Sequence, residues 1–369
     1  MRNILIIQPW FTAKGHPAQS LLNTACALES SEGIDYLISL EGEKQPFFKM
    51  SQELAKLSSL RTFRVNSASL QIGTLKALMC LFKRRKLLGD TTVLFLDGHL
   101  IVFACCWLFL RFWICPKRIG LLYLKGPERI HSYWLTRKLV AWLLGFKEFV
   151  LYLRTEELEK DWKVLFPDAD GSHVRTIPSL ELSNCALSKL APKKEQQLNF
   201  GVLGQIRKGK GLEWLVPLFQ QNSRLGKLTV AGTFYNEAEE KALPQLRSFE
   251  GFRNEFLSEE AMLSCAKQQD YLLMLYDDWD ARMESAILYL AAKVRRPVIA
   301  YNRGWCGRKV AMFGCGLLVS NNVDFEAFLA SLPHTESKEY TELLEGVDRF
   351  VQAHSGEVAR TEFLRALLE

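Results

Sequence analysis

The stretch NFGVLGQIRKGKG, residues 199–211, is the most informative part of the sequence. Its apolar beginning belongs to a predicted strand over residues 198–203, and the apolar spacing that follows it predicts a helix over residues 212–220. Three glycines, Gly204, Gly209 and Gly211, lie in the loop between them. A strand that passes through glycines into a helix is typical of an α/β unit with a parallel sheet.

The same loop has the composition of an anion-binding site. Glycine lets backbone N–H groups approach an anion closely, and the next helix begins with unpaired N–H groups and the positive end of its dipole. Arg207 and Lys210 add cationic donors. This combination suits a diphosphate leaving group. The alternative is a solvated basic turn, and a Walker loop is excluded because Gly211 follows Lys210.

Outward from this loop, strand and helix patterns alternate along both halves of the chain. The strands are continuously apolar and each is followed by a helix, which favours a parallel sheet covered on both faces. Predicted strands are residues 3–8, 34–40, 62–65, 91–96, 118–124, 148–153, 198–203, 227–231, 252–256, 271–276, 297–301 and 316–319. Predicted helices are residues 20–30, 52–57, 75–88, 100–114, 133–144, 212–220, 237–246, 258–267, 284–294, 339–351 and 357–368.

We therefore predict an α/β protein with two Rossmann-like, doubly wound domains. The first covers residues 1–180, residues 181–197 form a polar linker, and the second covers residues 198–352. Ligands of such sheets bind beyond the carboxyl ends of the strands, so we expect a central cleft between the domains.

Composition fits a globular protein in a reducing compartment. The chain has nine cysteines without regular spacing, which we interpret as reduced core residues of a cytoplasmic protein. The apolar run near the N-terminus is too short for a signal peptide. Residues 1–180 have a net charge of +8 and residues 181–369 a net charge of −2, so the halves are expected to meet different partners.

Several segments resemble the GT4-type glycosyltransferases of the GT-B fold. FGVLGQIRKGKGLEWLV (200–216) is similar to the "GRL…KG…L" opening of that family's C-terminal domain, and LAAKVRRPVIA (290–300) is similar to its "EAma.G.PVia". The resemblance spans nearly the whole chain and is clearest over residues 200–320. It implies a nucleotide-sugar donor, no bound metal, and a terminal helix, residues 353–369, that crosses back to the first domain.

The donor loop keeps part of the family pattern. The family's arginine after the first loop glycine falls on Gln205, and Arg207 can replace it; Lys210 keeps the family's lysine position. The resemblance thus implies that Gly204, Gln205, Arg207 and Lys210 bind the donor.

The family's two glutamates, eight positions apart, are missing. They fall on Arg282 and Leu290, and the nearest carboxylates are Asp280 and Glu284. We predict that Asp280 and Glu284 bind the donor and that Glu284, at the start of its predicted helix, also takes part in catalysis. Altered donor binding, lost activity and a register shifted by two residues stay open as explanations.

The first half contributes further candidates. His99, in Asp97-Gly-His99 after a predicted strand, suits proton transfer, with a capping or partly buried histidine as the alternative. By resemblance, a histidine of the reaction centre falls on Lys125, and the loop with Gly15 and His16 lies on the acceptor side.

A metal ion is not expected at the acidic loop of Asp277, Asp278 and Asp280. These carboxylates could hold Mg²⁺, but acidic loops are usually solvated. We predict no metal and no cofactor; the donor is a substrate, and UDP, GDP and dTDP sugars are equal candidates.

The segment LKALMCLFKRRKLLG, residues 75–89, predicts a basic amphipathic helix. Leu75, Leu78, Met79 and Phe82 share one side, and Lys83–Lys86 cluster at its end. Such a helix associates with anionic lipid, or is an ordinary core-facing helix whose last turn is cationic. We predict no transmembrane helix and no nucleic-acid partner, but peripheral contact with the inner face of a membrane.

The leading hypothesis is a glycosyltransferase that moves a sugar from a nucleotide donor to a glycan or lipid-linked acceptor in cell-envelope or exported polysaccharide synthesis. The alternative is a non-catalytic GT-B subunit that binds glycan or a partner enzyme.

Overall fold

The chain divides into two units. Unit 1 comprises Met1–Asn184 and Ser355–Glu369, and unit 2 comprises Cys185–His354. The computed structural model describes residues 3–9, 17–28, 34–38, 69–83, 85–131, 133–168, 172–183, 197–277 and 282–369. Gly15, His16, Asp278, Asp280, the predicted helix 52–57 and the predicted strand 62–65 lie outside these residues.

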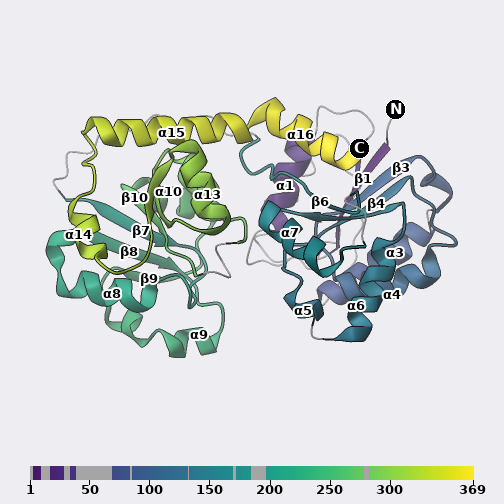
Figure 1. Ribbon diagram of the computed structural model, residues 1–369, viewed down its shortest axis with the longest axis horizontal. Helices are drawn as coiled ribbons and strands as arrows, with labels where there is room; N and C mark the ends of the chain where they lie inside the picture. Colours follow the sequence, from purple (N-terminus) through teal and green to yellow (C-terminus); the bar gives the residue numbers. More distant parts are fainter. Residues whose placement is uncertain are drawn as a thin grey trace. The chain divides into compact units, whose positions relative to one another are not determined.

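Unit 1 contains a six-stranded parallel sheet in the order β2-β1-β3-β4-β5-β6 (Figure 1). The strands are β1 Asn3–Gln8, β2 Ile34–Ile38, β3 Thr91–Phe95, β4 Arg118–Leu122, β5 Phe149–Leu153 and β6 Val174–Thr176. The helices are α1 Pro17–Leu28, α3 Leu70–Lys83, α4 Leu100–Leu110, α5 Glu128–His131, α6 Trp134–Leu144, α7 Glu156–Leu165 and α16 Gly356–Leu368.

Both faces of this sheet are covered, which explains why its strands are continuously apolar. Successive side chains of a strand point to opposite faces. Phe95 of β3 accordingly packs in the core that α3, α4, α6 and α7 cover, together with Trp107 and Trp162. Leu94 packs on the other face with Phe363 of α16. The last helix of the chain therefore belongs to unit 1, where the Arg118 guanidinium also donates to the Leu367 carbonyl at 3.2 Å.

Unit 2 contains a second six-stranded parallel sheet in the order β12-β11-β10-β7-β8-β9. The strands are β7 Asn199–Leu203, β8 Lys227–Gly232, β9 Phe252–Asn254, β10 Tyr271–Met274, β11 Val298–Tyr301 and β12 Gly316–Val319. The helices are α8 Leu212–Gln221, α9 Glu237–Ala242, α10 Glu259–Lys267, α12 Ala286–Lys293, α13 Gly304–Phe313, α14 Phe325–Ala330 and α15 Lys338–His354. Two doubly wound, Rossmann-like units confirm the predicted fold class.

The strand orders define one topological switch point in each unit. In unit 1, β1 pairs with β2 on one side and β3 on the other, and in unit 2, β7 pairs with β8 on one side and β10 on the other. Ligands of doubly wound sheets bind beyond the carboxyl ends of the two strands at such a point. The segments after β1 and β3, and those after β7 and β10, are therefore where a site is expected.

Some elements differ from the sequence prediction. Helix α3 begins at Leu70 rather than residue 75, because Ser69 stands before it and accepts from the Ile72 N–H, and it ends at Lys83 before a 3₁₀ turn, Arg85–Leu87. Helix α13 was not predicted, since it begins with a glycine and contains Gly307. A Cβ at Gly307 would lie 2.3 Å from the Tyr301 carbonyl oxygen, so glycine allows this helix to approach β11. Helices α7 and α14 and strand β6 were also missed.

No helix within the described ranges is long and apolar enough to cross a membrane. Cys80, Cys105, Cys106, Cys115, Cys265 and Cys315 of the described residues form no disulfide.

Candidate functional site

The loop after β7 has the backbone that its glycines predict. Gly204, Gly209 and Gly211 have φ angles of 92°, 79° and 75°, in the region where residues with a side chain are strained. Gly211 is the N-cap of α8, and no side chain among the described residues caps that helix end. The strand, glycine loop and helix N-terminus predicted from residues 199–211 are thus present.

Hydrogen bonds fix the shape of this loop. The Ile206 N–H donates to the Thr233 carbonyl at 2.8 Å, which ties the loop to the segment after β8. The Lys208 N–H donates to a Glu239 carboxylate oxygen at 2.7 Å, and the Gly209 N–H donates to Glu213 at 3.3 Å. Two loop amides that could have bound a phosphate are therefore occupied by carboxylates.

Two cationic side chains lie close to Tyr276, just after β10. Lys210 is only 8% exposed, and its Nζ lies 5.7 Å from the Tyr276 ring centroid. Arg303, after β11, donates to the Tyr276 carbonyl at 3.3 Å, and its guanidinium lies over the Tyr301 ring at 4.5 Å. Arg303 was missed by the sequence reading, although it follows a predicted strand at the same edge. The Gln205 side chain is exposed and Arg207 is half-buried.

The acidic residue after β10 lies against the glycine loop. A Cβ at Gly209 would lie 2.2 Å from an Asp277 carboxylate oxygen, and the Asp277 N–H donates to the Gly209 carbonyl at 2.8 Å. The glycine is therefore required by the close approach of Asp277 as well as by its φ angle. Within the described residues, no group of three or more His, Cys, Asp or Glu side chains is arranged to hold a metal ion.

The expected position of Glu284 at the start of a helix is wrong. Helix α12 begins at Ala286, because Ser285 is its N-cap and accepts from the Ile287 N–H at 3.3 Å. Glu284 lies before the cap, and its carboxylate accepts a 2.5 Å hydrogen bond from the Tyr289 hydroxyl. Ser285 also lies 3.2 Å from the Tyr276 hydroxyl, so this segment still borders the cations around Tyr276.

The backbone supports the sequence register that leaves the donor glutamate missing. In the pattern quoted for residues 290–300, the family's glycine falls on Arg295. Arg295 has a φ of 55°, a left-handed conformation that glycine adopts at little cost. Leu290, at the glutamate position of the same pattern, is 8% exposed within α12. A shift of two residues would remove the agreement at Arg295.

Arg295 is held in this conformation by a bidentate ion pair. Its Nε and Nη2 donate to the Asp348 carboxylate on α15 at 2.8 and 2.7 Å. We expect Asp348→Ala to lower the free energy of unfolding by about 1–2 kcal/mol. In that background, Arg295→Gly should restore about 1 kcal/mol by relieving the left-handed strain. Urea unfolding of the wild type, the two single variants and the double variant measures both effects. A double variant with a lower free energy of unfolding than Asp348→Ala alone would contradict the prediction.

In unit 1, Asp97, His99 and Lys125 lie near one another beyond β3 and β4. Asp97 follows β3 and accepts from the Gly98 N–H at 2.8 Å. Burial raises the pKa of the Asp97 carboxyl to about 6, although the Gly98 N–H and the charge of Lys125 oppose the rise. Lys125, after the neighbouring strand β4, is exposed and its carbonyl accepts from the Trp162 indole N–H at 3.2 Å. The structure therefore brings Lys125 near a carboxyl that titrates close to neutrality.

His99 has the capping role that was its alternative interpretation. It is the N-cap of α4, its Nδ1 accepts from the Val102 N–H at 3.4 Å, and its own N–H donates to the Thr74 hydroxyl at 2.9 Å. Burial, and then the charge of Lys125, lower the pKa of His99. Because Nδ1 of His99 accepts from a backbone N–H, this nitrogen is already engaged in capping α4.

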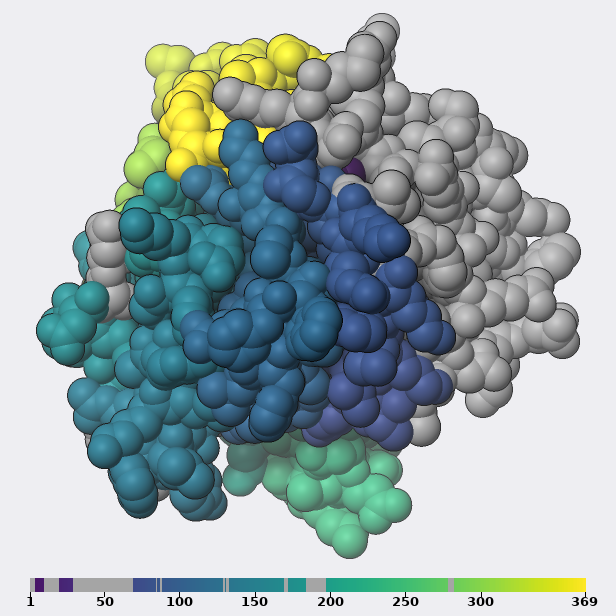
Figure 2. Space-filling model, turned by 90° about the vertical axis from the view of Figure 1, so that its right-hand side faces the viewer, coloured from purple at the N-terminus to yellow at the C-terminus, as the bar shows by residue number. Residues whose placement is uncertain are grey.

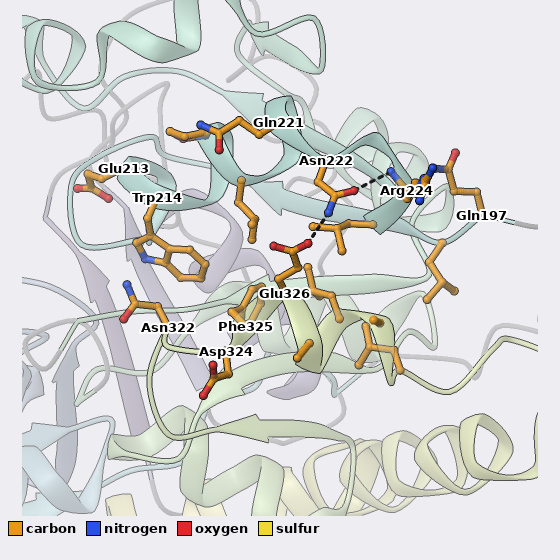
Figure 3. A pocket seen from close by; sticks show the side chains of 18 of the residues that line it. Gln197, Glu213, Trp214, Gln221, Asn222, Arg224, Asn322, Asp324, Phe325 and Glu326 are labelled. Atoms are coloured by element: carbon orange, nitrogen blue, oxygen red, sulfur yellow. Dashed lines mark hydrogen bonds between the residues drawn. The ribbon is translucent and has the colours of Figure 1, made fainter.

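A separate groove of about 1250 Å³ runs along α8 and α14 (Figure 3). Trp214, Phe325 and Asn222 line it, and the Asn222 side chain donates to Glu326 across it. Apart from Glu213 and Trp214 in the first turn of α8, the groove does not share the residues described above.

Comparison with known proteins shows the fold. Neither a family model nor a curated protein matches the sequence. Among solved structures, the chain is similar to a glycosyltransferase from Rickettsia africae, with a TM-score of 0.66, 11% identity and coverage of 99% and 97% of the two chains. It is also similar to Anabaena HepE in complex with UDP-glucose, with a TM-score of 0.66, 10% identity and coverage of 99% and 98%.

The fold is GT-B. Sucrose-phosphate synthase from Thermosynechococcus elongatus is similar over 99% of this chain and 98% of its own, with a TM-score of 0.65 and 14% identity. The trehalose-6-phosphate phosphatase N-terminal domain of Candida albicans is similar at a TM-score of 0.68 and 9% identity. GT-B neighbours therefore carry names of different activities, and the function must be argued from the site.

Proposed function

We propose that this GT-B protein is a glycosyltransferase that takes a sugar from a nucleotide-sugar donor. The observation that carries the proposal is the glycine loop at the switch point of unit 2, with Lys210 near the Tyr276 ring and Arg303 bonded to the Tyr276 carbonyl. Cationic donors fixed in place before the ligand arrives stabilise a diphosphate as charge develops on it.

The diphosphate contacts in this proposal are made by side chains and the first turn of α8. The amides of Lys208 and Gly209 already donate to carboxylates. The uncapped N-terminus of α8 and the cations Lys210, Arg303 and Arg207 provide the complementary positive charge. In this proposal the exposed Gln205 side chain lies next to the donor and makes no diphosphate contact.

Transfer breaks the bond between the anomeric carbon and the diphosphate oxygen and forms a bond from that carbon to an acceptor hydroxyl oxygen. The nucleoside diphosphate leaves with the electron pair, and the hydroxyl proton goes to a base. We propose Asp97 as this base, positioned with Lys125 at the switch point of unit 1, because a carboxyl with a pKa of about 6 is ionised at neutral pH yet basic enough to accept a proton.

The proposal can be made more specific for the donor and for the acceptor. Because HepE was solved with UDP and UDP-glucose, a UDP-sugar is the first donor to test. We propose a glycan or lipid-linked hydroxyl acceptor of cell-envelope or exported polysaccharide synthesis, and cytoplasmic peripheral association with anionic membrane through Lys83, Arg85 and Lys86. We further propose that no bound metal is needed, in which case a chelator leaves transfer unchanged.

The alternative is a non-catalytic subunit of a glycosylation complex. Leu290, where the resemblance implies a glutamate that holds the donor ribose, favours it, because a buried leucine cannot accept a hydrogen bond. Thermal unfolding with UDP, GDP and dTDP sugars separates the two functions. A donor at a hundred times its Kd should stabilise an enzyme by about 2.7 kcal/mol, and no stabilisation by any of them would reject donor binding.

Glu284 tests whether another carboxylate replaces the missing glutamate. We expect Glu284→Gln to reduce sugar transfer strongly while changing the melting temperature little, because glutamine keeps an oxygen that accepts from Tyr289. Transfer assays and thermal unfolding of the same preparation check this. Intact transfer in this variant would show that Glu284 does not replace the missing glutamate.

A further inference from the structure

Helix α4 is apolar on all sides, yet it lies at the surface of unit 1. Its sequence, LIVFACCWLFL, contains no charged residue. One side, with Phe103 and Trp107, packs in the core. Along the other side Ile101, Leu108 and Phe109 are exposed. A helix that is apolar all round is expected in a protein core or in contact with lipid.

The turn after α4 continues this apolar surface with aromatic side chains. Phe109 is 74% exposed, Phe112 68% and Trp113 59%. The neighbouring helices add to it: Ile72, Leu75 and Met79 on α3, and Tyr133, Trp134 and Leu135 at the start of α6. Helix α4 contacts both α3 and α6, so these residues belong to one helical layer, which Figure 2 shows in blue toward the viewer.

The structure corrects the amphipathic pattern predicted for α3. Leu78 points into the core with Ala77 and Leu81, whereas Leu75 and Met79 are exposed. The apolar residues assigned to one side of this helix are therefore divided between the core and the surface. The surface ones extend the layer around α4.

Cationic side chains lie over exposed and partly buried aromatic rings of this layer. The Arg85 guanidinium lies over Phe82 at 4.7 Å, and Phe82 contacts Trp113 with ring centroids 6.3 Å apart. Arg111 lies over Phe112 at 4.5 Å. Likewise, Lys138 lies over Trp134 at 4.7 Å.

Residues 69–148, which form this layer and the strands beneath it, contain thirteen Lys and Arg against four Asp and Glu. Aromatic and apolar side chains with cationic neighbours are the composition of surfaces that lie in a membrane interface. A partner protein with a mixture of positive and negative surface charges would be less complementary to this strongly cationic surface.

We infer that the outer face of α3, α4 and α6 is a membrane-insertion surface, with Phe109, Phe112 and Trp113 entering a phospholipid bilayer and Lys83, Lys86 and Lys117 contacting anionic headgroups. The inference deepens the proposed membrane association and rests on it, but not on sugar transfer. It differs from binding through the basic end of α3 alone, because insertion of apolar side chains persists when salt screens the charges.

The test is binding of the full chain to vesicles of phosphatidylcholine and of phosphatidylcholine with phosphatidylglycerol. We expect binding to both, stronger to the anionic vesicles, with part of it surviving an increase from about 0.1 M to about 1 M salt. Each of Phe109→Ser, Phe112→Ser and Trp113→Ser should weaken binding about tenfold on both vesicle types. Lys83→Gln with Lys86→Gln should weaken binding to the anionic vesicles only.

Phe256→Ser is the matched control, since Phe256 is 52% exposed in unit 2 and should leave binding unchanged. Unchanged thermal unfolding and donor-dependent stabilisation of the three variants exclude misfolding and separate this test from that of the donor site. Wild-type binding that vanishes at high salt, or binding unaffected by the three substitutions, would overturn the inference. A dimer that the substitutions dissociate, without vesicle binding by the wild type, would show that a second copy covers the face instead.

Discussion

Asp97→Asn is expected to reduce kcat/KM for sugar transfer by about 10²–10⁴-fold, the usual contribution of a positioned base. Asparagine keeps the shape and the oxygen that accepts from Gly98, but it cannot take a proton. In the wild type, transfer should fall as the pH falls through about 6, because Asp97 becomes protonated. The pH profile of kcat/KM for both proteins checks this, and the variant should lack that limb.

Asp97→Asn is expected to lower activity but to increase the stability of the folded protein. The pKa of Asp97 is raised in the folded protein, so its contribution to stability is full below the unfolded value of 3.8 and is lost as the pH rises through about 6. At pH 7 the ionised carboxyl is therefore destabilising. Allowing for its partial exposure, we expect Asp97→Asn to raise the free energy of unfolding by about 1–2 kcal/mol at pH 7, and by almost nothing near pH 4.

Asp90→Asn is the control, since Asp90 is exposed just before β3, at the opposite end of the strand that Asp97 follows. It should leave sugar transfer unchanged. If Asp97→Asn gained stability but transferred sugar normally, Asp97 would be buried for a reason unrelated to the reaction, and the base would have to be another group.

Lys210→Met is expected to weaken donor-nucleotide binding by about 10–150-fold. The change removes a charge-assisted contact worth about 1.5–3 kcal/mol and keeps most of the side-chain volume beside Tyr276. Calorimetric titration with the nucleoside diphosphate measures the loss. Because the Lys210 side chain is almost fully buried, thermal unfolding of the same variant must show that the protein stays folded at the titration temperature.

Lys208→Met provides the comparison within the same loop. Lys208 is exposed, and the loop contact at this position is made by its backbone N–H with Glu239, which the substitution retains. We expect less than a threefold change, as for a screened surface charge. Equal losses in both variants would mean that the loop attracts nucleotide by its overall charge, and no specific diphosphate contact by Lys210 would then be supported.

The candidate site was partly predictable. The loop of Gly204, Gly209 and Gly211 follows from local sequence, because glycine between a strand and a helix signals left-handed backbone wherever the chain folds. Asp97 and Arg303 were not found as site residues. Asp97 is an ordinary aspartate in sequence, and its burial beyond β3, which only the folded chain produces, raises its pKa. Arg303 gains its position because β11 pairs with β10.

The sequence by itself determined the class of the fold, since continuous apolar strands alternating with helices can bury both faces only as covered parallel sheets. It also determined the cationic glycine loop. Tertiary structure decided where α12 begins, that His99 caps α4 and that α4 is exposed on one side. All three features depend on which neighbouring elements cover a residue. Apolar spacing within a helix predicts which residues share a side, but it does not predict whether that side faces the core or the surface.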